Sequence, residues 1–209
     1  MIRTHASDHG HDIDLDAALD FLNTLELESG QLVDHLVEPA DAATWFADHA
    51  LIHADTVDAW TARDLERVRV VRNALLDVVD SVVEGRSPEP GSVELVNAAL
   101  ATQPTLRLEM DGSACRVGHG HSAAPVDDAL AVLADVIVGE LATGRPERFR
   151  ICANDRCRWT FYDDSPTGRR RWCDMRTCGN QAKAARHRER VKAQASAGPS
   201  PDTAPAPPA

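Results

Sequence analysis

Four cysteines in the last third of the chain have the type and spacing of a metal site. Cys152 and Cys157 are separated by four residues, fifteen residues follow, and Cys173 and Cys178 repeat the four-residue gap. Zinc favours four thiolate ligands, and a short gap within each pair lets one backbone turn present two sulfurs to one ion. The alternatives are two disulfides or four unrelated buried thiols. The matched pairs favour one structural Zn²⁺, and four protein ligands leave no open position for a catalytic water.

The segment that contains these cysteines is also strongly basic. Residues 144–195 hold 14 Lys and Arg against 6 Asp and Glu, whereas residues 1–143 hold 8 against 26. The chain's net charge of −11 therefore combines a basic segment of +8 with an acidic segment of −18 and one acid in the tail. Such asymmetry suggests that the basic segment contacts nucleic acid. Docking of the basic segment on the chain's own acidic part is the alternative.

The basic side chains follow a pattern that suits phosphate binding. Three arginines occupy positions 169–171, and a helix is predicted over residues 181–194, where basic residues recur at steps of three and four and so share one face. Phosphate contacts would give salt-dependent affinity with little sequence selectivity. A solvated helix face would look the same. The candidate nucleic-acid residues are Arg169, Arg170, Arg171, Asn180, Lys183, Arg186 and Arg190.

The elements predicted around the cysteines explain how the four thiols would meet. Alternating residues predict strands at 148–151 and 159–162, so the first cysteine pair lies at the end of a hairpin. The second pair lies at the start of the basic helix, where the helix dipole favours thiolate. We therefore expect a treble-clef- or ribbon-like zinc module at 146–194. A module of about 45 residues has too little core to fold without its metal.

The preceding segment, residues 13–143, is predicted to be a separate helical domain. Apolar residues at helical spacing predict helices over 13–25, from 39–41 through Trp45 and Phe46, and over 61–85, 93–100 and 125–141, with Asp41, Thr61 (or Asp58) and Ser92 as N-caps. Between the last two helices, polar and apolar residues alternate on either side of Asp111-Gly112. This alternation around a turn sequence predicts a β-hairpin over 105–117. The fold class is thus mainly α with a small hairpin (α+β). Residues 1–12 and 196–209 are expected to be disordered.

Polar residues within the predicted helices form a second candidate site. Asp20 and Asn23 lie on successive helical steps, and Arg72 and Asn97 belong to other helices. These four side chains could line a ligand pocket. A buried hydrogen-bond network that fixes helix packing is the alternative, and Thr24 would join it.

Several segments together resemble a known bacterial family. The C-x4-C pair, WTFYDDS, RRRWCDMRTCGN and the basic helix resemble the CGNR-type zinc finger, while DFLNTLE, VRNALLDVV and VELVNAALA resemble its N-terminal partner domain, ABATE. The resemblance spans about residues 13–193 and implies a transcription regulator whose N-terminal domain senses stress. It carries the four thiol ligands onto Cys152, Cys157, Cys173 and Cys178. The Cys-Gly-Asn-Arg motif that gives the family its name matches Cys178, Gly179 and Asn180, but Gln181 stands in place of its arginine. Weaker or altered nucleic-acid binding is therefore expected.

Together these observations predict a zinc-dependent DNA-binding regulator whose acidic domain senses, dimerises or restrains the basic module. An RNA-binding or protein-interaction module with purely structural zinc is the alternative. The sequence has no nucleophile elbow, Gly-rich phosphate loop or His-Glu metal motif, and a turn-capping role accounts for the adjacent Asp163 and Asp164, so we expect no enzyme. The N-terminus lacks the apolar region of a secretory signal peptide, and the sequence has no apolar run of about 18 residues, so we expect a cytoplasmic protein without a membrane partner. If it binds duplex DNA, it would be associated with the nucleoid. A homodimer is a further option.

Overall fold

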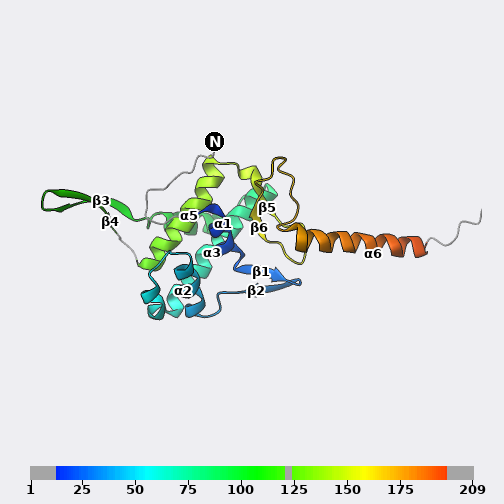
Figure 1. Cartoon of the computed structure of the whole chain (residues 1–209), viewed down its shortest axis with the longest axis horizontal. Coiled ribbons are helices and arrows are strands. Elements are labelled where there is room, and N and C mark those ends of the chain that lie inside the picture. The colour runs from blue at the N-terminus through cyan, green and yellow to red at the C-terminus, as the bar shows by residue number, and fades with distance from the viewer. Residues whose placement is uncertain (1–12, 121–123, 197–209) are drawn as a thin grey trace, which may run out of the picture.

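The computed structural model describes residues 13–120 and 124–196 (Figure 1). This part of the chain is mostly helical and includes three two-stranded antiparallel hairpins. A helical body occupies the middle of the molecule, a hairpin arm projects from one end, and one long helix projects from the other (Figure 1). The predicted fold class, mainly α with a ribbon-like C-terminal part, is confirmed. The predictions of disorder concern residues that, apart from Ser196, lie outside the described ranges.

Five α-helices build the body around one apolar core. They are α1 (Leu15–Asn23), α2 (Pro39–Asp48), α3 (Ala62–Glu84), α4 (Pro90–Leu100) and α5 (Pro125–Thr143), with a short 3-10 turn, η1 (Ala54–Ala59), after α2. The long helices α3 and α5 meet through fully buried side chains such as Leu75, Leu133 and Ile137. Helix α1 adds Phe21, whose ring meets the Phe46 ring edge-on at 5.8 Å and the Trp45 ring at 5.4 Å between centroids. Burial of this apolar surface is the main force that holds the body together.

The helix starts follow local capping rules, which the sequence predicted only in part. Thr61 caps α3, as expected, and its hydroxyl and the Asp64 carboxylate form a capping box. The cap predictions for α2 and α4 were wrong. Asp41 occupies the third position of α2 and bonds back to the cap residue, Glu38, because Pro39 provides the first helical position. Likewise α4 starts at Pro90 rather than after Ser92.

A hairpin directly follows α1 where a continued helix was predicted. Helix α1 ends at Asn23, and strands β1 (Leu25–Glu28) and β2 (Gln31–Asp34) pair antiparallel. Ser29 and Gly30 form the turn with φ of 55° and 89°, the left-handed conformation that tight hairpins need. Leu25 fits helical spacing after Leu22, but the alternation of leucine and glutamate from residue 25 to 28 carries the strand signal.

A buried arginine holds this hairpin against the body. The Arg72 side chain is 1% exposed and donates two hydrogen bonds to the Asp34 carboxylate, at 2.8 and 2.7 Å, and a third to the Thr24 hydroxyl at 3.0 Å. Burial works against ionisation of Asp34, but the hydrogen bonds from Arg72 and the Leu36 N–H outweigh it, so the pKa of Asp34 lies below its usual value. A buried cation therefore has its charge and its donors satisfied.

The hairpin arm matches the sequence prediction closely. Strands β3 (Thr105–Asp111) and β4 (Ala114–Gly120) pair in register, and Asp111 lies opposite Ala114 across a turn in which Gly112 has φ of 61°. The arm extends away from α4 and α5 (Figure 1). Its Leu108 and Met110 side chains are 71% and 63% exposed.

The C-terminal module is joined to the body through a shared core and a buried hydrogen-bond pair. A short turn, η2 (Pro146–Arg148), leads into strands β5 (Phe149–Ile151) and β6 (Thr160–Tyr162), which pair antiparallel. Phe149 is 1% exposed, belongs to the body's core, and meets the Tyr162 ring edge-on. The Asn23 amide exchanges two hydrogen bonds of 2.9 Å with the backbone N–H and C=O of Thr160, so this side chain pairs with β6 much as another strand would.

No helix within the described residues is long and apolar enough to cross a membrane.

Replacing Asp34 by Asn tests the Arg72 link through its pH dependence. Near neutral pH we expect the free energy of unfolding to fall by about 3 kcal/mol, because a buried guanidinium loses its counter-charge. The folded pKa of Asp34 is lowered, so its contribution is present above the unfolded value of about 3.9 and is lost as pH falls through the folded value. Urea unfolding should therefore show the two proteins converging below about pH 4. Asp55→Asn, an exposed control, should behave like wild type; a pH-independent difference would contradict the account.

Replacing Asn23 by Ala tests the joint between body and module. The substitution leaves the buried N–H and C=O of Thr160 without partners, which we expect to cost about 3 kcal/mol. Hydrogen exchange of the Thr160 amide should accelerate strongly. The matched control is Asn97→Ala on the exposed face of α4. Unchanged protection of Thr160 in Asn23→Ala would show that the module docks without this pair.

Candidate metal centre and basic helix

The four predicted cysteines converge in space. Their sulfur atoms all lie within 4.8 Å of one another, with Cys157–Cys173 at 3.7 Å and Cys173–Cys178 at 3.8 Å. A tetrahedral zinc ion with bonds of about 2.3 Å places its ligand sulfurs about 3.8 Å apart. A disulfide needs about 2.05 Å, and all four are free thiols. The donor set and its spacing therefore fit one zinc ion.

Each cysteine pair is positioned by a tight local structure. Cys152 follows β5 and donates its N–H to the Trp159 carbonyl at 2.8 Å, while the Cys157 N–H bonds to the Asn154 carbonyl at 2.8 Å. In the second pair, Cys173 precedes a one-turn π-helix, η3 (Met175–Gly179), and Cys178 lies within it. Its cap is Asp174, which accepts from the Arg176 N–H at 2.6 Å. The wider π turn brings the Cys178 sulfur beside that of Cys173.

A buried carboxylate shapes the loop between the two pairs. Asp163 is 0% exposed and accepts hydrogen bonds from the Ser165 N–H and hydroxyl and from the Arg170 N–H, at 3.1, 2.6 and 2.8 Å. Burial opposes its ionisation, but these hydrogen bonds and the nearby Arg148 hold the pKa of Asp163 below its usual value. Arg148 also donates to the Asp163 and Ser165 carbonyls. Asp163 thus organises the loop, which agrees with the capping interpretation.

The thiols affect one another's ionisation. A hydrogen bond from Cys173 lowers the pKa of Cys152 to about 5, burial raises the pKa of Cys157 to about 12, and the bond that Cys173 donates raises its own pKa. Thiolates this close repel one another, so full ionisation of the set requires a cation among them. The cluster can accordingly hold a metal ion.

Sequence reasoning missed an amide that contacts the cluster from outside. The side-chain NH₂ group of Asn154 donates to the Cys178 sulfur at 3.4 Å and to the Gln181 side-chain oxygen at 3.0 Å. Such outer hydrogen bonds orient metal-binding groups. The Asn-Asp pair within the first cysteine loop signals a turn, but nothing local indicates the distant sulfur. Gln181 replaces the family arginine, and its side-chain oxygen accepts this hydrogen bond from Asn154.

The basic helix α6 (Asn180–Ser196) starts directly after the π turn and projects from the body (Figure 1). Lys183, Arg186 and Arg190 are exposed and line one face together, as predicted, with Glu189 and Ala193 beside them. Asn180 is also exposed, and its amide N–H bonds to the Arg176 carbonyl at 2.9 Å.

The arginine run divides into one inward and two outward side chains. Arg169 and Arg171 are exposed, and Arg171 lies over the Trp172 ring at 5.1 Å. Arg170 instead lies over the Phe161 ring at 4.9 Å and donates to the Cys173 carbonyl at 2.6 Å. The side chain is 38% exposed, and its guanidinium also pairs with Asp164 at 3.3 Å and so supports the module, while its phosphate-binding role stays a prediction.

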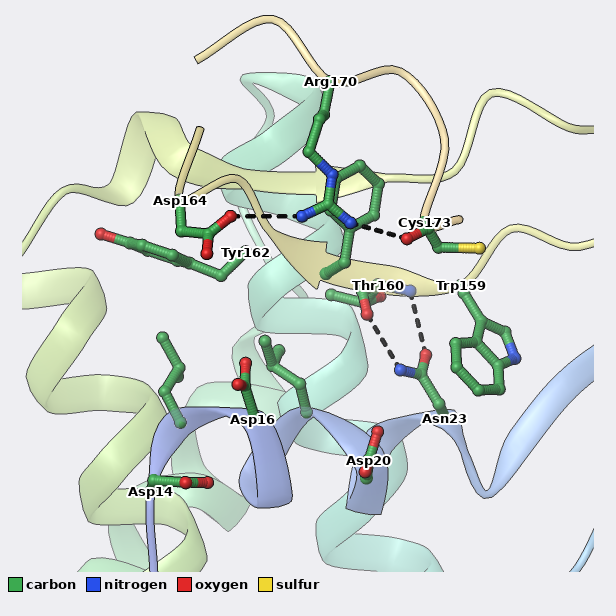
Figure 2. Close-up of a pocket in the computed structure, with 13 residues that line it drawn as sticks. Asp14, Asp16, Asp20, Asn23, Trp159, Thr160, Tyr162, Asp164, Arg170 and Cys173 are labelled. Carbon is green, nitrogen blue, oxygen red and sulfur yellow. Dashed lines mark hydrogen bonds and ion pairs between the residues drawn. The ribbon is translucent and has the colours of Figure 1, made fainter. Parts of the chain in front are cut away.

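A cleft of about 500 Å³ separates the exposed face of α1 from the module (Figure 2). In Figure 2 Asp16 and Asp20 stand on α1, and Arg170 and Asp164 face them from the module. Burial raises the pKa of Asp20. Of the four residues predicted to share a pocket, Asp20 and Asn23 line this cleft. Arg72 lies instead in the buried link to Asp34, and Asn97 is exposed on α4, because packing of α3 and α4 turns them elsewhere.

The comparisons with protein families can be set beside this geometry. A model described as "ABATE: Putative stress-induced transcription regulator" matches residues 15–145. The chain belongs to the ABATE family. A second model, the CGNR zinc finger, matches residues 148–191, the part that contains the four cysteines. The resemblance drawn from the sequence is thus confirmed. A search of curated proteins returned no match for this ABATE protein.

Replacing Cys173 by Ser tests the metal centre. We expect the purified wild-type protein to carry one zinc per chain and the variant to lose it, with loss of order in residues 149–196, because structural zinc contributes on the order of 10 kcal/mol to such modules. Elemental analysis and amide exchange measure the two effects. The control is Cys115→Ser, an exposed thiol on the hairpin arm, which should keep the zinc. Retention of a full zinc equivalent by Cys173→Ser would contradict the assignment.

Proposed function

We propose that this ABATE protein is a zinc-dependent DNA-binding transcription regulator that uses α6 as its contact helix. The observation that carries this proposal is the projection of a basic helix into solvent directly from the cysteine cluster (Figure 1). Cys178, in the π turn, precedes the first residue of α6 by two positions. The metal centre would therefore set the direction in which the helix leaves the module.

The charge and size of α6 suit the surface of duplex DNA. Residues 180–196 contain five Lys and Arg against one Glu. Seventeen helical residues extend about 26 Å at a rise of about 1.5 Å per residue. An α-helix with its side chains is about 10–12 Å in diameter. It therefore fits the major groove, which is about 12 Å wide, with basic side chains reaching the phosphates on either side.

The contact residues follow from exposure. We assign phosphate contacts to Arg169, Arg171, Asn180, Lys183, Arg186 and Arg190. Arg170 is partly exposed and supports the module through the Cys173 carbonyl, Phe161 and Asp164. Gln181 adds no charge and bonds to Asn154, so this chain would make one phosphate contact fewer than a relative with arginine there. That difference would lower affinity modestly and leave the metal site intact.

The helical domain would support the zinc module rather than cover α6. The module rests on the body through Phe149 and the Asn23–Thr160 pair, and α6 points away from the body (Figure 1). Residues 1–143 nevertheless carry a net charge of −18, which repels phosphates. Screening limits that repulsion to about 10 Å at 0.1 M salt, so a projecting helix is the part of the module that DNA can approach most easily.

A charge-matched pair of variants tests the role of α6. Replacing Arg186 and Arg190 by Gln should weaken duplex binding and reduce the slope of log affinity against log salt by about two, since each lost phosphate contact removes about 0.9. The control, Arg63→Gln with Arg107→Gln, removes the same charge from exposed positions on the body and arm. Fluorescence anisotropy over a salt series measures the affinity and the slope for each variant.

Equal slopes for the two variants would overturn the proposal, and binding to RNA alone would favour an RNA-binding module. Sedimentation of the same samples tests for a homodimer.

A further inference from the structure

A second group of metal-ligating side chains lies outside the cysteine cluster, on the hairpin β1–β2. Glu26, Glu28 and His35 offer ligand atoms that all lie within 4.8 Å of one another. The His35 Nε2 is 2.7 Å from the Glu26 carboxylate and 3.5 Å from that of Glu28. Strand register explains the convergence. Glu26 and Glu28 alternate onto one face of β1, and the residue after β2 pairs with Thr24, two positions before Glu26.

We propose that these three residues form a second, exchangeable binding site for a divalent first-row transition metal. One imidazole nitrogen with two carboxylates suits ions such as Zn²⁺, Ni²⁺ or Fe²⁺, whereas Mg²⁺ and Ca²⁺ prefer oxygen alone. Metal bonds of about 2.0–2.2 Å place neighbouring ligand atoms about 3 Å apart, close to the separations here. Three protein ligands leave positions for water, so the ion would exchange more readily than one held by four thiolates.

Contacts around the hairpin hold the site in shape. The other oxygen of the Glu26 carboxylate accepts a hydrogen bond from the Trp159 indole N–H, which leaves Oε1 directed at His35. The His35 backbone N–H donates to the Thr24 carbonyl at 2.8 Å. The Glu26 side chain is 16% exposed, while His35 and Glu28 are 44% and 55% exposed. An ion could therefore enter from solvent onto a carboxylate already oriented by its neighbour.

The same indole connects the hairpin to the cysteine cluster. Trp159 lies two residues after Cys157, and its carbonyl accepts the Cys152 N–H at 2.8 Å. The Glu26–Trp159 bond therefore connects the proposed site to a residue whose backbone contacts the cysteine cluster. An ion bound at Glu26 would fix the position of this carboxylate. Through the bond to Trp159 it would also fix how the zinc module packs against the body. The regulatory consequence, a metal-dependent placement of α6, rests on the proposed function; the binding itself does not.

Calorimetric titration of the zinc-loaded full chain with Ni²⁺ tests the site, because nickel can be told from the structural zinc by elemental analysis. We expect one Ni²⁺ to bind while one zinc remains. His35→Gln and Glu28→Gln should each weaken nickel binding at least about tenfold. His53→Gln and Glu94→Gln, matched changes at exposed positions elsewhere, should leave it unchanged. Trp159→Phe should weaken it several-fold through the loss of the indole N–H.

The histidines at positions 5, 9 and 11 could also bind nickel, so the titration must distinguish nickel bound there from nickel bound at His35. The variant with all three replaced by Gln should retain the nickel equivalent. The proposal would be overturned by loss of binding in that variant, by undiminished binding in His35→Gln, or by the absence of any nickel equivalent in wild type, which would identify His35 and its glutamates as an ion pair only. None of these results would alter DNA binding through α6 measured without nickel, so the two proposals fail separately.

Discussion

Four thiols within 4.8 Å of one another impose the constraint on which the C-terminal part of this protein depends. Four thiolates at that distance repel strongly, and only Cys152 and Cys178 are buried, so the thiols alone contribute little to a core. A divalent cation converts the repulsion into attraction and joins the β5–β6 hairpin to the π turn. The direction of α6 then follows, because Cys178 lies within the turn from which the helix continues.

The body supports this centre through contacts that reach across the sequence. Asn23, at the end of α1, satisfies the backbone of Thr160 in β6, and Phe149 completes the body's own core. Acidic residues are concentrated in the body and basic ones in the module, and α6 carries its basic residues outward, away from the body (Figure 1). Apolar packing and buried hydrogen bonds hold the two parts together, and the Arg158–Glu84 ion pair, at 3.6 Å, joins them at the surface.

Local signals were predictable from the sequence, and distant ones were not. The cysteine spacing, the Asp111-Gly112 turn and the Thr61 cap act over a few residues, so each appears as a pattern. The hairpin β1–β2 was missed because Leu25 also fits helical spacing, although Ser29-Gly30 marks its turn. The pairing of Asn23 with Thr160 spans 137 residues and leaves no local pattern. For the same reason Arg170 looked like its exposed neighbours until packing placed it over Phe161.

Duplex DNA binding by the full-length protein, with and without its zinc, tests the central claim most directly. The zinc-loaded protein should bind with an affinity that falls steeply as salt rises, roughly 0.9 logarithmic units per unit of log salt for each neutralised phosphate. Removal of the metal by a chelator should abolish that binding, and re-addition of zinc should restore it. Binding that survives removal of the metal, or no binding by the zinc-loaded protein at low salt, would contradict the account.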